Sequence, residues 1–145
     1  MNGFVSCQDE YSLLVRDLEQ ELQPAAEAYG LGILPYFPLA SGLLTGKYRR
    51  NESLPDGARL TLVKRLADRY MTDANWAKVE KLADFCERHD RSMLELAFSW
   101  LAGRRQVSSV IAGATTPDQV EQNVKAAEWV LGPEELAEID RITGA

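Results

Sequence analysis

Short apolar runs alternate with stretches of amphipathic periodicity along this chain. Residues 4–7 form an apolar run that leads into the polar residues 8–10, as a strand does when it ends at a functional rim. From residue 17 to residue 29, apolar side chains recur at three- and four-residue spacing, and Gly30 follows where a helix commonly ends in a left-handed residue. A second apolar run, residues 32–36, comes after a connection of the length typical of αβ units. The pattern predicts a strand, an amphipathic helix and a second strand.

Residues 37–59 fit no single regular element. They contain several glycines and prolines, which break helices and strands, but also too many apolar residues for an unstructured linker. The breakers are Pro38, Gly42, Gly46, Pro55 and Gly57. We therefore expect a long, ordered, functional loop.

Two helices are expected after this loop. Apolar residues up to Cys86 mark a helix that starts near Asp73, and Ser92 with Glu95 predicts a capping box at the start of the next helix.

A third strand and two more helices complete the predicted order. Residues 107–111 are rich in β-branched side chains and read as a strand. Thr116 then supplies an N-cap hydroxyl, with Pro117 at the first helical position and Gln119 at the third. A final helix runs from about Pro133 to the C-terminus.

Strands that alternate with helices, with no hairpin signal between them, predict an α/β fold of parallel strands joined by right-handed crossovers. Three such strands fit either half of a doubly wound sheet or an arc of an eight-stranded barrel, and periodicity alone leaves both open. With 145 residues, 46% of them hydrophobic, residues 1–145 are expected to be a single domain with a packed core.

Charge and cysteine content narrow the classes of partner. The net charge of −6 argues against a nucleic acid or an anionic membrane surface, since both need clustered Lys and Arg. The basic cluster of Lys64, Arg65 and Arg69 is too small for a nucleic-acid arm, although it is suited to face a phosphate. Cys7 and Cys86 have no CxxC spacing and are expected to be free thiols, and with no signal peptide or membrane span in the sequence we expect a cytoplasmic location.

Three stretches of the sequence, residues 6–14, 34–48 and 110–119, closely resemble the aldo-keto reductases, as do the closing residues 137–140. The resemblance runs over essentially the whole chain in the same order and spacing. It implies a partial TIM (β/α)8 barrel, in which about three parallel strands correspond to strands six, seven and eight. Three strands cannot close a barrel, so the first would expose an unpaired edge that must be covered, for example by self-association.

In a TIM barrel the functional site lies at the C-terminal ends of the strands, and phosphate is commonly held after strands seven and eight. Tyr36 matches the family tyrosine whose ring stacks on the nicotinamide, whereas without the motif an aromatic packed in the core would be favoured. Gln8 matches the glutamine that hydrogen-bonds the carboxamide, and the alternative is a solvent-facing glutamine on the rim.

The turn after Tyr36 resembles the loop whose backbone amides cradle the cofactor pyrophosphate, with Lys47 and Arg59 as charge partners. Phe37 stands where many members have serine, so one hydroxyl contact is lost while the backbone amide remains. A nucleoside-triphosphate P-loop at residues 42–48 is rejected, because the spacing is one residue short and Tyr48 stands where the magnesium-binding Ser or Thr must be. The loop residues matched to the family are Phe37, Pro38, Leu39, Ala40 and Gly42.

A last group of residues matches the family positions around the adenosine 2′-phosphate and adenine, at a helix N-terminus suited to anions. These are Gly113, Thr115, Gln119, Gln122 and Asn123. A structural role stands beside this one, because Thr116 and Gln119 are expected to form a capping box. The implied cofactor is NADP(H), and the choice between NADPH and NADH stays open because other members have arginine at the position of Gln119.

The resemblance assigns no catalytic residue to this chain, because the family's catalytic Asp, Tyr, Lys and His belong to earlier strands; no metal site is expected either. Without the tyrosine acid, hydride transfer to a carbonyl lacks its proton donor. The leading hypothesis is the cofactor-binding C-terminal portion of an NADP(H)-dependent reductase, inactive alone, with a small carbonyl substrate only in a completed barrel. The alternatives are a stand-alone dinucleotide-binding or regulatory module, and a half that complements a separate N-terminal half.

Overall fold

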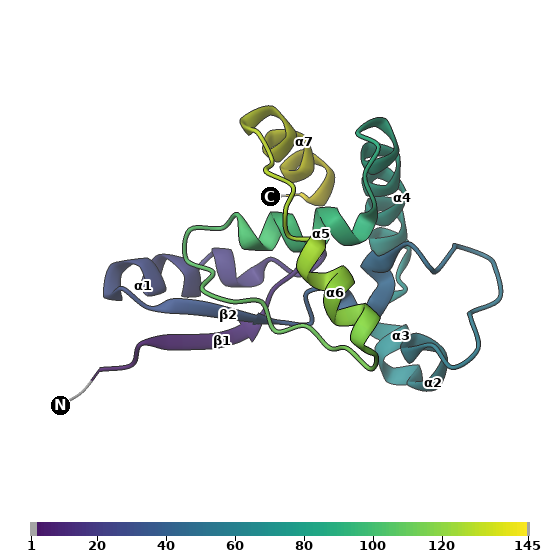
Figure 1. Cartoon of the computed structure of the whole chain (residues 1–145), viewed down its shortest axis with the longest axis horizontal. Coiled ribbons are helices and arrows are strands. Elements are labelled where there is room, and N and C mark those ends of the chain that lie inside the picture. Colours follow the sequence, from purple (N-terminus) through teal and green to yellow (C-terminus); the bar gives the residue numbers. More distant parts are fainter. Residues whose placement is uncertain (1–2, 145) are drawn as a thin grey trace.

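The computed structural model describes residues 3–144, which form a small parallel sheet with β1 at its outer edge and helices beside β2 and beyond the ends of the strands (Figure 1). In chain order the elements are β1 (Ser6–Glu10), the 3-10 helix η1 (Asp17–Glu19), α1 (Leu22–Tyr29), β2 (Gly32–Tyr36), the 3-10 helix η2 (Ala40–Thr45), α2 (Arg59–Leu62), α3 (Lys64–Tyr70), α4 (Asp73–Arg88), α5 (Met93–Ala102), α6 (Pro117–Lys125) and α7 (Pro133–Thr143).

The sheet consists of β1 and β2, which pair in parallel from Ser6 opposite Gly32 to Glu10 opposite Tyr36. β1 was expected at residues 4–7, and it instead includes the polar residues 8–10, because these pair with the apolar end of β2. Phe4, just before β1, is 89% exposed. A half-polar strand is therefore specified by its neighbour more than by its own composition.

The prediction of a third strand at residues 107–111 is wrong. In this segment only Val107 forms a bridge, an isolated parallel one with Ile33. The segment still runs beside β2, through backbone hydrogen bonds that join it to Ile33 and Pro35. The backbone N–H and C=O groups of the odd-numbered residues of β2 point toward this segment. Pro35 is one of these residues, and it has no N–H to donate. The carbonyl of Ile33 accepts from Ser108, so regular parallel pairing would bring the N–H of residue 110 to the carbonyl of Pro35. That carbonyl accepts from Ile111 instead, and the register therefore shifts by one residue.

The helix expected from residue 17 to residue 29 is divided into η1 and α1. Pro24 explains the division, because its ring excludes a helical carbonyl four residues earlier and confines Pro24 to the first turn of α1. The end of α1 is as predicted, with Gly30 left-handed at φ 66°.

The loop predicted at residues 37–59 contains the short helix η2, and the short helices α2 and α3, which sequence periodicity missed, follow it. α4, α5, α6 and α7 begin where their start signals placed them. The predicted capping box of Ser92 and Glu95 is formed at the start of α5.

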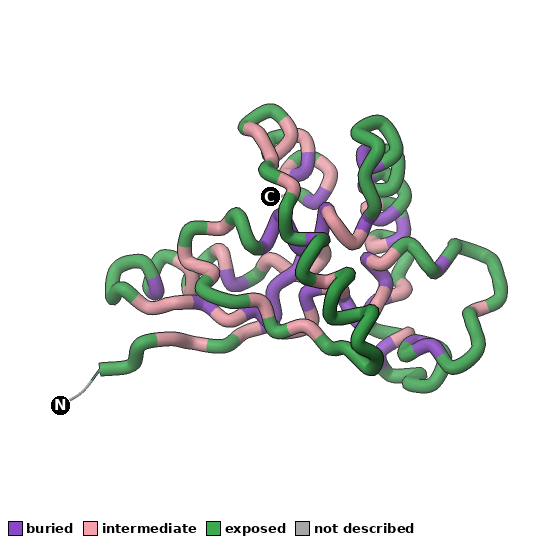
Figure 2. The backbone as a smooth tube through the Cα atoms, in the orientation of Figure 1, coloured by how far each residue is buried: buried purple, intermediate pink, exposed green. Residues whose placement is uncertain are grey.

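The core lies around α5, which is buried over most of its surface (Figure 2). Its buried side chains include Trp100, Leu96 and Leu101, and the same cluster extends to Ile33 in β2 and Ile139 in α7. α6 is exposed along nearly its whole length and has no buried residue. Among the described residues, no helix is long and apolar enough to cross a membrane.

Candidate functional site

The carboxyl ends of the two strands carry the first part of the predicted site. Side chains alternate across a strand, and paired residues share a face. The register therefore places Gln8 on the same sheet face as Glu10, Leu34 and Tyr36. Gln8 is exposed and Tyr36 is half-buried. Both predicted nicotinamide contacts thus lie on one face, two residues apart in register.

The chain turns sharply after Tyr36. Phe37, Ala40 and Ser41 have left-handed backbone conformations, with φ of 53°, 46° and 58°, and Gly42 follows at φ 101°. Such conformations cost about 1 kcal/mol or more in residues with a side chain and tend to occur at functional sites. Within the turn, the N–H groups of Ala40 and Gly42 donate to the carbonyls of Phe37 and Leu39, at 2.9 and 2.8 Å.

The side chain of Lys47 lies close to Gly42 in this turn. A Cβ added at Gly42 would lie 3.3 Å from Cε and 3.4 Å from Nζ of Lys47, and would also be strained by the positive φ. The same ammonium lies 5.1 Å from the centre of the Tyr48 ring. Gly42 therefore lets a positive charge approach the backbone of η2 closely.

Tyr48 also fixes the helix that carries Arg59, because its hydroxyl accepts a hydrogen bond of 3.1 Å from the backbone N–H of Leu60. The guanidinium of Arg59 then lies 5.1 Å above the ring of Phe37. That ring in turn meets Tyr36 edge to face, with centroids 5.4 Å apart. Phe37, where the family commonly has serine, thus links the predicted nicotinamide platform to a predicted charge partner.

The residues predicted around the 2′-phosphate lie on the segment leading into α6. Gly113, Thr115 and Gln122 are exposed. The hydroxyl of Thr116 accepts from the N–H of Gln119 at 3.3 Å, as predicted. The reciprocal half of that capping box is wrong, because the side-chain oxygen of Gln119 accepts at 2.7 Å from the N–H of Thr115 instead of that of Thr116.

One backbone contact relates this segment to the turn after β2. The N–H of Ile111 donates to the carbonyl of Pro35 at 2.8 Å. Pro35 directly precedes Tyr36, and Ile111 comes two residues before Gly113. Between residues 3 and 144 no hydrogen bond or salt bridge joins the predicted residues of the two segments directly.

A buried carboxylate at the end of β1 was missed by the sequence reasoning. Glu10 is only 8% exposed; Arg69 donates to its Oε2 at 2.5 Å, and the hydroxyl of Tyr70 donates to its Oε1. Burial, followed by this hydrogen bond, raises the pKa of Tyr70. The usable signals were the polar run at the end of the strand and the basic cluster that includes Arg69.

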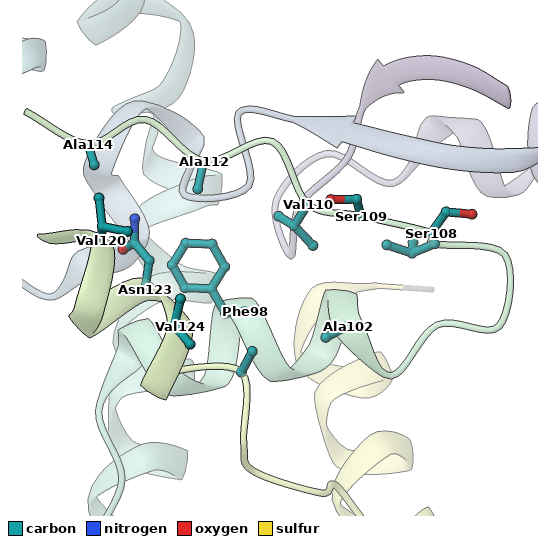
Figure 3. A pocket seen from close by; sticks show the side chains of 12 residues that line it. Phe98, Ala102, Ser108, Ser109, Val110, Ala112, Ala114, Val120, Asn123 and Val124 are labelled. Carbon is teal, nitrogen blue, oxygen red and sulfur yellow. The ribbon is translucent and has the colours of Figure 1, made fainter.

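Two cavities adjoin these segments. The larger, about 390 Å³, is a mostly apolar groove between α5, the segment after residue 107, and α6 (Figure 3). Phe98 points into it from α5, and Asn123 of the predicted residues lies on its wall. The smaller, about 320 Å³, is lined by Phe37, Arg59, Val63, Arg65, Leu66 and Arg69. In the described part of the chain, no group of three or more His, Cys, Asp or Glu side chains is placed to hold a metal.

Comparison with known proteins agrees with the resemblance seen in the sequence. The model of the Aldo/keto reductase family matches residues 2–143, and the chain belongs to that family.

The similar relatives carry different names. A probable voltage-gated potassium channel subunit beta of Oryza sativa subsp. japonica is 39% identical, over 93% of this chain and 42% of the relative. An L-glyceraldehyde 3-phosphate reductase of Escherichia coli O157:H7 is 34% identical, over 92% and 40%. Protein tas of Escherichia coli (strain K12) is 35% identical, over 95% and 39%. The chain thus spans about two fifths of the length of these relatives.

Proposed function

We propose that this chain binds NADP(H) as the C-terminal portion of an aldo-keto reductase barrel, corresponding to strands six to eight, and that it has no catalytic residue of its own. The observation that carries the proposal is the turn after Tyr36, where residues 37, 40 and 41 have left-handed backbone conformations and Gly42 lies beside the ammonium of Lys47. Backbone N–H groups and a lysine are the combination that holds phosphate in a loop. This turn follows a strand at the end where TIM-barrel sites lie.

Each predicted residue has a role in this proposal. Tyr36 stacks on the nicotinamide and Gln8 hydrogen-bonds its carboxamide, while Lys47 and Arg59 neutralise phosphate charge. The backbone of Phe37, Pro38, Leu39, Ala40 and Gly42 surrounds the pyrophosphate. When bound in its reduced form, the dinucleotide supplies the hydride; the residues of this chain bind and orient it.

The segment before α6 contacts the adenosine end in this proposal, through Gly113, Thr115, Gln119, Gln122 and Asn123. The side-chain oxygen of Gln119 accepts hydrogen bonds from Thr115, which leaves its amide N–H groups as donors toward a 2′-phosphate. The bond between Ile111 and Pro35 supports the common location of this segment and the pyrophosphate turn.

Titration of the purified chain with NADPH, followed by energy transfer from tryptophan to the reduced nicotinamide, tests the proposal. We expect saturable binding that Lys47→Gln weakens by about tenfold, the loss expected of one interaction with a charged group. Lys81→Gln is the matched control, since Lys81 is exposed on α4. NADH measures the contribution of the 2′-phosphate. A folded chain with no saturable binding of either dinucleotide would contradict the proposal.

The absence of catalytic residues is tested separately. We expect the isolated chain with NADPH and a small aldehyde to show no oxidation of the cofactor above the rate without protein. Carbonyl reduction by this chain alone would contradict that part of the proposal and leave the binding result unaffected.

A second candidate is a half that complements a separate N-terminal half. It is favoured by the outer edge of β1, which has no strand partner among residues 3–144, and by Phe4 and Val5, which are 89% and 83% exposed beside it. An unpaired edge with exposed apolar residues is suited to receive a further strand. Co-expression with the N-terminal three fifths of a related reductase should then restore NADPH-dependent activity, and no activity from a co-purified complex would count against this candidate.

A further inference from the structure

The turn that precedes α2 contains a pair of residues that the proposed function does not use. Asp56 is followed there by Gly57, and no other aspartate of the chain has glycine as its next residue. The side chain of an aspartate can react with the backbone nitrogen of the next residue, because the product is a five-membered ring. Glycine is the least hindered residue at that second position, since it has no Cβ and its backbone adopts many conformations.

Both residues are open to solvent. Asp56 and Gly57 are exposed, and no atom lies within 4 Å of the position that a Cβ on Gly57 would occupy. Within residues 3–144 the carboxylate of Asp56 has no Lys, Arg or His nitrogen within 4.0 Å. A ring formed at this place therefore meets no neighbouring side chain and breaks no ion pair.

The backbone nitrogen of Gly57 is available as the nucleophile. The N–H of Ala58 donates to the carbonyl of Pro55 at 3.2 Å and closes a turn in which Gly57 has φ 71°. In the part of the chain that the structure describes, the N–H of Gly57 itself donates to no backbone carbonyl. This nitrogen can therefore lose its proton to water without the loss of a backbone hydrogen bond.

We propose that Asp56 is a site of spontaneous isomerisation to isoaspartate. The nitrogen of Gly57 bonds to the side-chain carboxyl carbon of Asp56, the carboxyl hydroxyl and the N–H proton leave as water, and a succinimide ring results. Water then adds to the ring and breaks its bond between the nitrogen and the former backbone carbonyl carbon. The main chain now runs through the side-chain carbons of Asp56, and the former backbone carbonyl becomes a free carboxylate. One water leaves and one is added, so the mass is unchanged.

Isomerisation lengthens the main chain by one carbon within the turn. The carbonyl of Pro55 accepts from the N–H of Ala58 and, at 2.7 Å, from the hydroxyl of Thr61, so two hydrogen bonds join the turn to α2 and the residue before it. A longer turn displaces these groups, and Arg59 is the first residue of α2. Only the next consequence rests on the proposed function: displacement of Arg59 weakens the binding of the dinucleotide.

Peptide mapping of the purified chain, after incubation at physiological temperature and neutral pH, tests the proposal. Trypsin releases residues 51–59, in which Asp56 is the only aspartate. We expect this peptide to separate into two chromatographic species of identical mass, of which the new one accepts a methyl group from an isoaspartyl methyltransferase. A single species that accepts no methyl group after prolonged incubation would overturn the proposal.

Two controls assign the reaction to this turn. Asp56→Glu would require a six-membered ring, so the same peptide from this variant should remain a single species. Asp118 is the matched control in the same digest, because it is exposed on α6 but is followed by Gln119, whose N–H donates to the hydroxyl of Thr116 at 3.3 Å. A second species from Asp56→Glu, or an equal yield of isomer at Asp118, would overturn the assignment to Asp56 and Gly57.

The NADPH titration tests the consequence for Arg59. The incubated chain should bind about tenfold more weakly than the fresh chain, as for the loss of one interaction with a charged group, and incubated Asp56→Glu should keep the affinity of its fresh form. Equal losses in both incubated proteins would overturn the link to Arg59. If the chain binds no dinucleotide at all, peptide mapping still decides whether Asp56 isomerises, so the two failures are distinguishable.

Discussion

The hydroxyl of Tyr70 donates a hydrogen bond to the carboxylate of Glu10, 60 residues earlier in the chain. The contact joins the end of β1 to the end of α3 within a buried site. We expect Tyr70→Phe to lower the free energy of unfolding by about 1–3 kcal/mol, because one carboxylate oxygen of Glu10 then loses its buried donor. Urea unfolding followed by circular dichroism measures the change. Tyr29→Phe is the control, since Tyr29 is 81% exposed, and equal stabilities of the two variants would show that the contact contributes nothing.

Pro35 limits the pairing between β2 and the segment that follows α5. Pro35→Val would supply the missing N–H donor on the side of β2 that faces this segment. We expect the amides of Ser108 and Ile111 to exchange their hydrogens more slowly, measured by NMR in deuterated solvent. Pro55→Val, in the exposed loop, should leave both rates unchanged. Unchanged exchange in Pro35→Val would mean that something other than the proline prevents a third strand.

The capping box of α5 should stabilise the fold in a pH-dependent way. The backbone N–H of Ser92 donates to Glu95 and lowers the pKa of that carboxyl below its usual 4.5. A carboxyl whose pKa is depressed by folding stabilises the protein above about pH 4.5, and this stabilisation is lost as the pH falls through the folded pKa. We expect Glu95→Gln to reduce stability at pH 7 but to have a smaller effect at pH 3, by urea unfolding at both values.

The hydroxyl of the same cap has an effect of its own. Ser92→Ala should cost about 1 kcal/mol at pH 7, because the N–H of Glu95 loses its acceptor at the start of the helix. Ser109→Ala, at an exposed position outside any helix, serves as the control and should change stability by less than about 0.5 kcal/mol. A loss as small as the control's would mean that solvent replaces the cap.

The two thiols should differ in reactivity. Burial, and to a smaller extent the charge of Glu95, raises the pKa of Cys86 to about 12, whereas Cys7 is only half-buried at the edge of the sheet. Since the thiolate is the reactive form, iodoacetamide at pH 8 should modify Cys7 in the native chain and Cys86 only after unfolding in urea. Peptide mass spectrometry distinguishes the sites. Equal labelling of both cysteines in the native chain would contradict the burial of Cys86.

Local signals predicted the end of α1 and the starts of α4 to α7, because the groups that start and stop a helix are close in sequence. Gly30, the pair Ser92 and Glu95, and the cap hydroxyl of Thr116 each act within about four residues and behave as expected, whereas the side chain of Gln119 bonds Thr115 instead of closing a capping box. The prediction of a third strand was wrong because strand formation depends on the partner strand. Pro35 lies in β2, more than 70 residues away, and nothing within residues 107–111 indicates that it interrupts the pairing.

The residues of the candidate site come from the resemblance and stay a prediction, and the sequence did not predict the side chains that contact them. Arg59 lies over the ring of Phe37, and Arg69 donates to the carboxylate of Glu10. Both contacts join segments that are distant in sequence. Neither contact leaves a periodic pattern along the chain. Tertiary contacts of this kind become visible only when the turn after β2 and the helix α3 are folded against the same edge.

The loop at residues 49–57 lies between η2 and α2, and all of its residues except Leu54 are exposed (Figure 2). A protease would therefore cut there first, but the cut would not separate the fold. η2 remains packed against α5, and Arg16 before the cut still pairs with Asp140 after it, at 2.7 Å. A nicked chain should migrate as two bands under denaturing electrophoresis and yet elute as one particle in gel filtration, so the covalent link at this loop is dispensable once folding is complete.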